Sequence, residues 1–101
     1  MPHDIQTVGF DADQKLLDYV EKKVEKLESI WDRITDIKVY LKLEEKSSHI
    51  KDKTAEVKIN VPGSTLFAKE SSKKFEEALD SAANSVKQQV RKYKDKLESK
   101  Y

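Results

Sequence analysis

The last third of the chain carries an apolar repeat that limits what this sequence can fold into. Apolar residues recur at steps of three and four over seven helical turns: Phe75, Leu79, Ala82, Val86, Val90, Tyr93 and Leu97. This spacing predicts an amphipathic helix from about Ser72 to Glu98. A helix with one long apolar stripe must pack against a second apolar surface, which the rest of the chain has to supply.

Two alternating segments can form that surface. Apolar residues stand at every second position from Ile37 to Leu43, while Lys38, Tyr40 and Lys42 point the other way. The same alternation runs from Ala55 to Val61. Both segments are therefore predicted to be strands with one buried face and one face in water.

Shorter signals complete the strands. The run 5–8 predicts a first strand, and 65–69 predicts a last one. Pro62 and Gly63 suit the second and third positions of a type II turn between the last two strands, because Pro fixes φ and Gly accepts a positive φ. The polar stretch 44–53 is expected to form a loop.

Near the N-terminus the period changes to that of a helix. Apolar residues step by three and four at Leu16, Val20, Val24, Leu27 and Trp31. Asp13 can accept backbone N–H bonds as the N-cap, so a helix from about Asp13 to Ser29 is predicted. The element order becomes β-α-β-β-β-α. It predicts an α+β two-layer sandwich, with two helices on one face of a four-stranded sheet, similar to a double-stranded-RNA-binding domain.

Composition narrows the class of protein. The 101 residues are enough for a single domain, 1–101, and contain no cysteine. The two histidines, His3 and His49, are far apart, and two glycines cannot form a phosphate-binding loop. No catalytic residue, metal, cofactor or small-molecule substrate is expected. No segment is apolar enough to span a membrane or act as a signal peptide, so we expect a cytoplasmic protein without a membrane partner.

Charge is unevenly distributed along the chain. The formal net charge is only +1, from 20 basic and 19 acidic residues. Residues 1–32 hold four basic and eight acidic groups, whereas residues 87–101 hold six basic and two acidic ones. Any binding of a polyanion must therefore use a local patch.

The predicted helices carry the candidate patch. Lys87, Arg91 and Lys94 fall within about 60° of one another on a helix. Lys22, Lys23 and Lys26 form a smaller cluster on the first helix. Lysines near helix ends are also commonly solvated and favourable to the helix dipole, so charge alone does not identify an RNA site.

The aromatic residues favour a core over a stacking surface. Trp31, Phe67 and Phe75 are predicted to be buried, and Tyr40 is the candidate for an exposed stacking residue because it lies on the wet face of its strand.

Several runs together resemble one family. They are Asp-Gln-Lys-Leu-Leu-Asp-Tyr-Val-Glu-Lys-Lys-Val-Glu-Lys-Leu-Glu (13–28), Val-Pro-Gly (61–63), Leu-Phe-Ala (66–68), Ala-Leu-Asp (78–80) and Gln-Gln-Val-Arg-Lys-Tyr-Lys (88–94). In order and spacing they resemble the ribosome hibernation promoting factors, also called ribosome-associated inhibitors or ribosomal subunit interface proteins. The length resembles that of the family's short form.

The resemblance implies a non-enzymatic translation inhibitor. Such proteins bind the small ribosomal subunit where messenger and transfer RNA would sit, and silence the 70S ribosome in stationary phase or stress. The residues expected to contact ribosomal RNA are Lys22, Lys23, Lys26, Lys87, Arg91, Lys92 and Lys94. Ser85 and Gln88 depart from positions that are often basic in the family, and Lys87, which charge and helical spacing select, stands where a Glu is common. An alternative is a protein-interaction module that binds a protein partner through its open strand face or a sheet edge.

Overall fold

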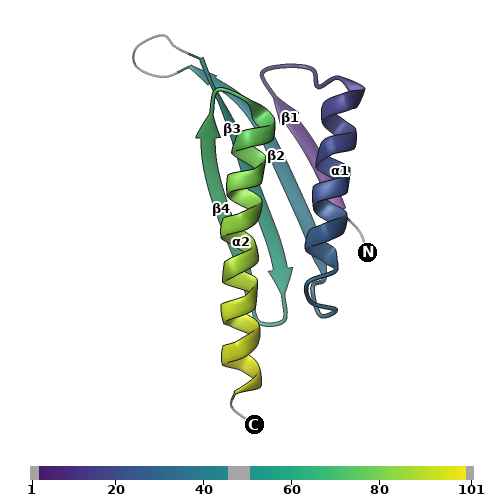
Figure 1. Ribbon diagram of the computed structural model, residues 1–101, viewed down its shortest axis with the longest axis vertical. Helices are drawn as coiled ribbons and strands as arrows, with labels where there is room; N and C mark the ends of the chain where they lie inside the picture. The colour runs from purple at the N-terminus through teal and green to yellow at the C-terminus, as the bar shows by residue number, and fades with distance from the viewer. Residues whose placement is uncertain (1–2, 46–50, 100–101) are drawn as a thin grey trace.

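The computed structural model describes residues 3–45 and 51–99, and its elements follow the predicted order (Figure 1). They are β1 (His3–Val8), α1 (Gln14–Glu28), β2 (Asp36–Glu45), β3 (Lys51–Val61), β4 (Ser64–Ser72) and α2 (Phe75–Glu98). The predicted α+β sandwich of two helices on a four-stranded sheet is therefore confirmed.

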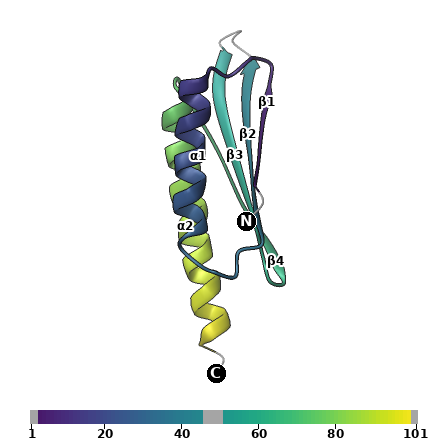
Figure 2. The ribbon, with the colours of Figure 1, turned by 90° about the vertical axis from the view of Figure 1, so that its right-hand side faces the viewer.

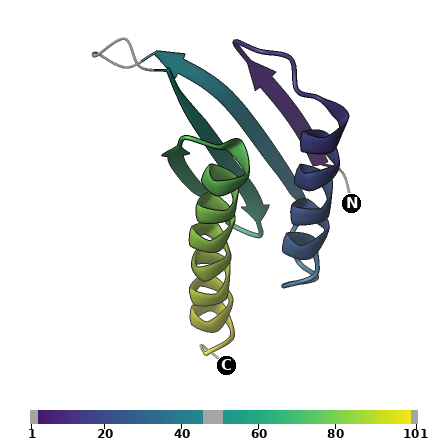
Figure 3. The ribbon, with the colours of Figure 1, turned by 45° about the horizontal axis from the view of Figure 1, so that its top comes forward.

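The sheet is mixed, and its order in space is β1-β2-β3-β4. β1 runs parallel to β2, while β2, β3 and β4 pair antiparallel. Parallel neighbours need a long crossover, and α1 provides it. Both helices cover the same face of the sheet (Figure 2), with α1 on the side of β1 and α2 on the side of β4 (Figure 3). The other face is left open.

The core fills the space between the helices and the sheet. Of the alternating strand positions predicted to be buried, all are buried except Leu43, which is half-buried; Val39 and Val57 lie at the centre of the sheet. They pack in one cluster with Val24 of α1 and Leu79 of α2. Trp31 is buried as predicted. The two helical stripes and the alternating strands therefore cover one another, which fixes both helices on the same layer.

The helix starts are set by local hydrogen bonds. Asp13 caps α1 as predicted, because its Oδ1 accepts the backbone N–H of Leu16 at 2.9 Å. The second helix begins three residues later than predicted. Ser72 stays in β4, where it pairs with Lys53, and its hydroxyl donates to Glu77. Strand pairing therefore keeps Ser72 in the sheet, although the apolar period predicted it to be helical.

Strands extend further than the apolar pattern indicated. The expected loop 44–53 is wrong at both ends, since Glu44 pairs with Asp52 in the β2–β3 ladder. Backbone hydrogen bonds continue there although the side chains are polar. Residues 46–50 of that predicted loop lie outside the described residues. The turn before β4 is as expected, with Gly63 at φ +80°.

Phe67 contradicts the prediction that it is part of the core. Its side chain is 45% exposed. The register places it opposite Lys58 on the open face, while Ala68 beside it is buried against the helices. The run Leu66 to Ala68 is apolar at every position, so alternation could not assign its faces.

Candidate nucleic-acid interface

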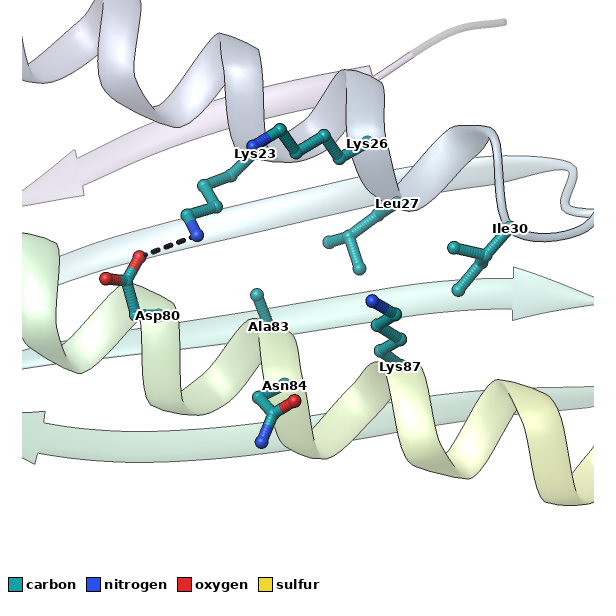
Figure 4. A pocket seen from close by; sticks show the side chains of 8 residues that line it. All are labelled: Lys23, Lys26, Leu27, Ile30, Asp80, Ala83, Asn84 and Lys87. Carbon is teal, nitrogen blue, oxygen red and sulfur yellow. Dashed lines mark ion pairs between the residues drawn. The ribbon is translucent and has the colours of Figure 1, made fainter.

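A cleft of about 130 Å³ runs between α1 and α2. The cleft is lined by Lys23, Lys26 and Leu27 of α1, by Ile30 in the turn after α1, and by Asp80, Ala83, Asn84 and Lys87 of α2. We call this feature the basic cleft, because it contains three lysines and a single carboxylate. Figure 4 shows Lys23 reaching across to Asp80, and Lys87 pointing into the space beside Leu27.

Helical spacing explains why these residues meet. On both helices the lining residues follow steps of three and four, which place side chains on one face, and on α2 Lys87 follows Asp80 by seven. Leu27 and Ala83 belong to the buried stripes and form the apolar wall of the cleft. The lysines occupy the border of each stripe, so packing the two helices side by side brings all three lysines to the lining of one groove.

Asp80 links the two helices inside the basic cleft. The Tyr19 hydroxyl of α1 donates to both Asp80 oxygens, at 2.7 and 2.9 Å. The Lys23 ammonium lies 3.0 Å from Asp80 Oδ1 and 5.8 Å from the centre of the Tyr19 ring. Asp80 is therefore bound to two side chains of the other helix, and its carboxylate partly neutralises the cleft.

The same contact changes the acidity of Tyr19. Its hydrogen bond to Asp80 raises the pKa of Tyr19 to about 12, and burial and the charges of Asp80 and Glu76 act in the same direction. Tyr19 accordingly remains a hydrogen-bond donor to Asp80 well above neutral pH.

The structure gathers three of the seven predicted contact residues. Lys23, Lys26 and Lys87 line the basic cleft. Lys22 is exposed on α1 outside it. The remaining three, Arg91, Lys92 and Lys94, lie further along α2, whose C-terminal end continues beyond α1 (Figure 1). Arg91 and Lys94 continue the face of Lys87, because they follow it by four and seven residues.

Sequence reasoning missed the role of Asp80 and Tyr19. The Ala-Leu-Asp run (78–80) contributes to the family resemblance, but Tyr19 and Asp80 are 61 residues apart. Their contact depends on how the two helices pack, and no local spacing indicates it.

On the open face of the sheet, some lysines form ion pairs with carboxylates of neighbouring strands. Lys42 lies 2.8 Å from Glu56, and Lys69 lies 3.9 Å from both Glu44 and Glu56. The hydrogen bond to Glu56 raises the pKa of Lys42. Tyr40 lies on this face as predicted but is only partly exposed, with the Lys42 ammonium 5.9 Å from its ring centre.

Other kinds of site are not found in the part of the chain that the structure describes. Within residues 3–45 and 51–99 no group of His, Asp or Glu side chains could hold a metal ion. Neither of the described helices is long and apolar enough to cross a membrane.

Comparison with known proteins decides the family. The model of the family "Sigma 54 modulation protein / S30EA ribosomal protein" matches residues 3–98. The chain belongs to this family. The S30EA match includes both helices and hence every residue of the basic cleft.

Curated relatives in the S30EA family carry names that agree with the resemblance. The chain is 31% identical over 84 residues to a ribosome hibernation promotion factor of Deinococcus radiodurans, covering 83% of this chain and 44% of that protein. It is 29% identical over 89 residues to a ribosome hibernation promoting factor of Pseudomonas putida, covering 88% and 82%. The chain thus spans less than half of the Deinococcus relative and most of the Pseudomonas one.

Solved structures share the fold. A ribosomal subunit interface protein from Coxiella burnetii superposes with a TM-score of 0.77 at 24% identity, covering 92% of this chain and 98% of that one. The N-terminal domain of Thermus thermophilus Protein Y gives 0.74 at 25% identity, covering 89% and 94%. The chain therefore shares its β-α-β-β-β-α sandwich with both solved proteins.

Proposed function

We propose that this protein binds the small ribosomal subunit through ribosomal RNA and silences idle ribosomes by occupying the region of messenger and transfer RNA. The observation that carries the proposal is the basic cleft, where lysines of two helices meet in a member of the S30EA family. The names of the relatives support a role in ribosome hibernation. Such a role needs neither catalysis nor a cofactor, and it belongs in the cytoplasm.

The proposed mechanism is that the bound protein occupies the region where messenger and transfer RNA would bind and so keeps them out. Lysine and arginine neutralise RNA phosphates and release condensed counterions, which supplies affinity without a base code. Sequence-independent recognition of folded RNA relies on shape and backbone contacts. A narrow two-layer protein with its cations on the helix layer can enter an RNA cleft with that layer first.

The proposed contacts form two groups. The first is the basic cleft, with Lys23, Lys26 and Lys87, and Lys22 beside it on α1. The second is the C-terminal end of α2, with Arg91, Lys92 and Lys94. The end of α2 extends past α1 (Figure 1), and Arg91 and Lys94 continue the face of Lys87 along it, so RNA bound in the basic cleft can follow α2 toward its C-terminal end.

Cosedimentation with 30S and 70S particles tests the proposal. We expect the protein to pellet with ribosomes at about 100 mM salt and to be released as salt rises, since phosphate contacts weaken steeply. The double variant Lys26→Glu/Lys87→Glu should lower the affinity at least about 100-fold. Absence of the wild-type protein from the ribosomal fractions at low salt would refute the proposal.

A matched control is available on the open face. Lys38 and Lys58 pair in register on β2 and β3, and neither forms an ion pair with another described residue. Lys38→Glu/Lys58→Glu changes the net charge from +1 to −3, as the cleft variant does. We expect this control to bind ribosomes within about twofold of the wild type, because the loss in the cleft variant is local.

A protein-interaction module is a second candidate function. Val8 and Phe67 are large apolar side chains exposed at 50% and 45% on the two outer strands. Docking of a protein there depends on apolar contact and weakens little with salt. Arg91→Glu/Lys92→Glu should abolish ribosome binding under the leading proposal and leave such a contact intact.

A further inference from the structure

Asp80 is unusual for a residue in a phosphate-binding groove. It lines the basic cleft with three lysines, and its side chain is 47% exposed. A phosphate oxygen beside this carboxylate meets a like charge, which opposes binding. A cleft that only collected phosphates would gain nothing from this residue.

The carboxylate keeps acceptor capacity that faces the cleft. An ionised carboxylate offers about four lone-pair sites. In the described residues Asp80 engages the Tyr19 hydroxyl and the Lys23 ammonium. Both partners come from α1, which holds Asp80 in place at the cleft wall. A ligand group that donates a hydrogen bond can use the remaining sites.

RNA has such a donor next to every phosphate. The ribose 2′-hydroxyl both donates and accepts hydrogen bonds, and it is the group by which a protein distinguishes RNA from DNA. Lys26 and Lys87 remain free of any ion pair with a described residue, so they can take the phosphate.

We infer that Asp80 is the residue that makes the basic cleft selective for ribose: it accepts a hydrogen bond from a 2′-hydroxyl while Lys26 and Lys87 bind the adjacent phosphate. The inference rests on the proposed function, since it names how the same cleft recognises its RNA. Asp80 also disfavours polyanions that lack a donor, which limits binding to the many other anionic polymers of a cell.

The test compares two probes that differ only at the 2′ position. One is an unstructured 12-nucleotide RNA, and the other is the same sequence with 2′-fluoro sugars, which keep the RNA-like pucker but have no hydroxyl donor. Binding is measured by fluorescence anisotropy at low salt. We expect the wild type to bind RNA about two- to tenfold more tightly than the fluoro probe, the contribution of one hydrogen bond.

Substitution at Asp80 should remove this preference. In Asp80→Ala we expect equal affinity for both probes. The main change should be that the fluoro probe binds this variant more tightly than it binds the wild type, because the repulsion between the Asp80 carboxylate and the phosphate is gone. A wild type without preference, or a variant in which both affinities shift by the same factor, overturns the inference. Asp18→Ala, which removes an exposed carboxylate of α1 outside the cleft, should keep the preference.

A second variant separates selectivity from helix tethering. Tyr19→Phe breaks the hydrogen bond to Asp80 but leaves its carboxylate, so it should lower stability and keep the preference for RNA. If Tyr19→Phe also loses the preference, Asp80 acts only by holding the helices and the inference fails. Wild-type cosedimentation with ribosomes is scored separately, so failure of the proposed function is distinguished from failure of the 2′-hydroxyl contact.

Discussion

Both faces of the sheet carry lysines and carboxylates, but these charged residues are arranged differently on the two faces. On the covered face, the helices bury the apolar side chains, and Lys23, Lys26 and Lys87 line the groove between the helices, where Lys23 contacts Asp80. On the open face, Lys42 and Lys69 lie close to Glu56, whose side chain is only 12% exposed. Among the described residues, the open face pairs Lys42 and Lys69 with carboxylates and leaves Lys38 and Lys58 unpaired, whereas the helix layer brings three lysines to one groove.

This difference explains how a chain with a net charge of +1 can have a basic surface. Charges that form ion pairs between neighbouring strands count in the formal net charge of the chain, but they are not available to bind a ligand. A nucleic-acid surface is therefore defined by where cations lie together in one groove, and the total charge is a poor guide to it.

The largest expected effect is on stability, and it differs between a phenylalanine on the covered side of the sheet and one on its open face. Phe75 is buried and stacks on Phe10 with ring centres 4.4 Å apart, whereas Phe67 is exposed. Phe75→Ala should lower the free energy of unfolding by about 3–5 kcal/mol, because it removes a buried ring and leaves a cavity. Phe67→Ala should change it by at most about 0.5 kcal/mol. Urea unfolding followed by circular dichroism measures both, and equal losses would mean that the open face is also packed.

The open face nevertheless has one buried polar contact of its own. Thr54 is fully buried although it pairs with Lys42 of β2, and its hydroxyl lies 2.8 Å from that of its β4 partner Ser71. Thr54→Val should cost about 0.5–1.5 kcal/mol, since it removes this hydrogen bond. Thr7→Val in β1 is the control, because the Thr7 hydroxyl forms no hydrogen bond within the described chain. Similar unfolding free energies for both variants would show that the Thr54 hydrogen bond contributes nothing.

Salt dependence distinguishes the lysines of the two faces more finely. Lys87→Gln should reduce the slope of log affinity against log salt by about 1 and weaken ribosome binding roughly threefold, the effect of one phosphate contact. Lys58→Gln on the open face should leave the slope unchanged. The measurement is cosedimentation at several salt concentrations. A slope that falls equally in both variants would mean that the cleft has no special role.

Sequence predicted the elements, the helix layer and most of the core because apolar period is a local property. It placed Lys23, Lys26 and Lys87 among the candidates, because charge at helical spacing is also local. It did not predict that β1 pairs with β2, that Phe67 faces solvent, or that Asp80 joins Tyr19. Each depends on register or helix packing between distant segments, and Phe67 in particular stands in an apolar run without alternation.

The smallest expected effect reports on the cleft in the free protein. The pKa of Tyr19 is raised from 10.0 to about 12, first by its hydrogen bond to Asp80. Between these pH values the folded protein keeps the tyrosyl proton that the unfolded chain releases, so the contribution of Tyr19 to stability is present below pH 10 and is lost as pH rises toward 12. Absorbance at the tyrosinate band should show a late-titrating group that is missing from Tyr19→Phe. Asp80→Asn should move this titration to lower pH, because the carboxylate charge is lost while the helices stay in contact. If the late titration persists unchanged in Asp80→Asn, the Tyr19–Asp80 contact does not exist in solution. The two helices would then lack the hydrogen bond that joins them across the basic cleft.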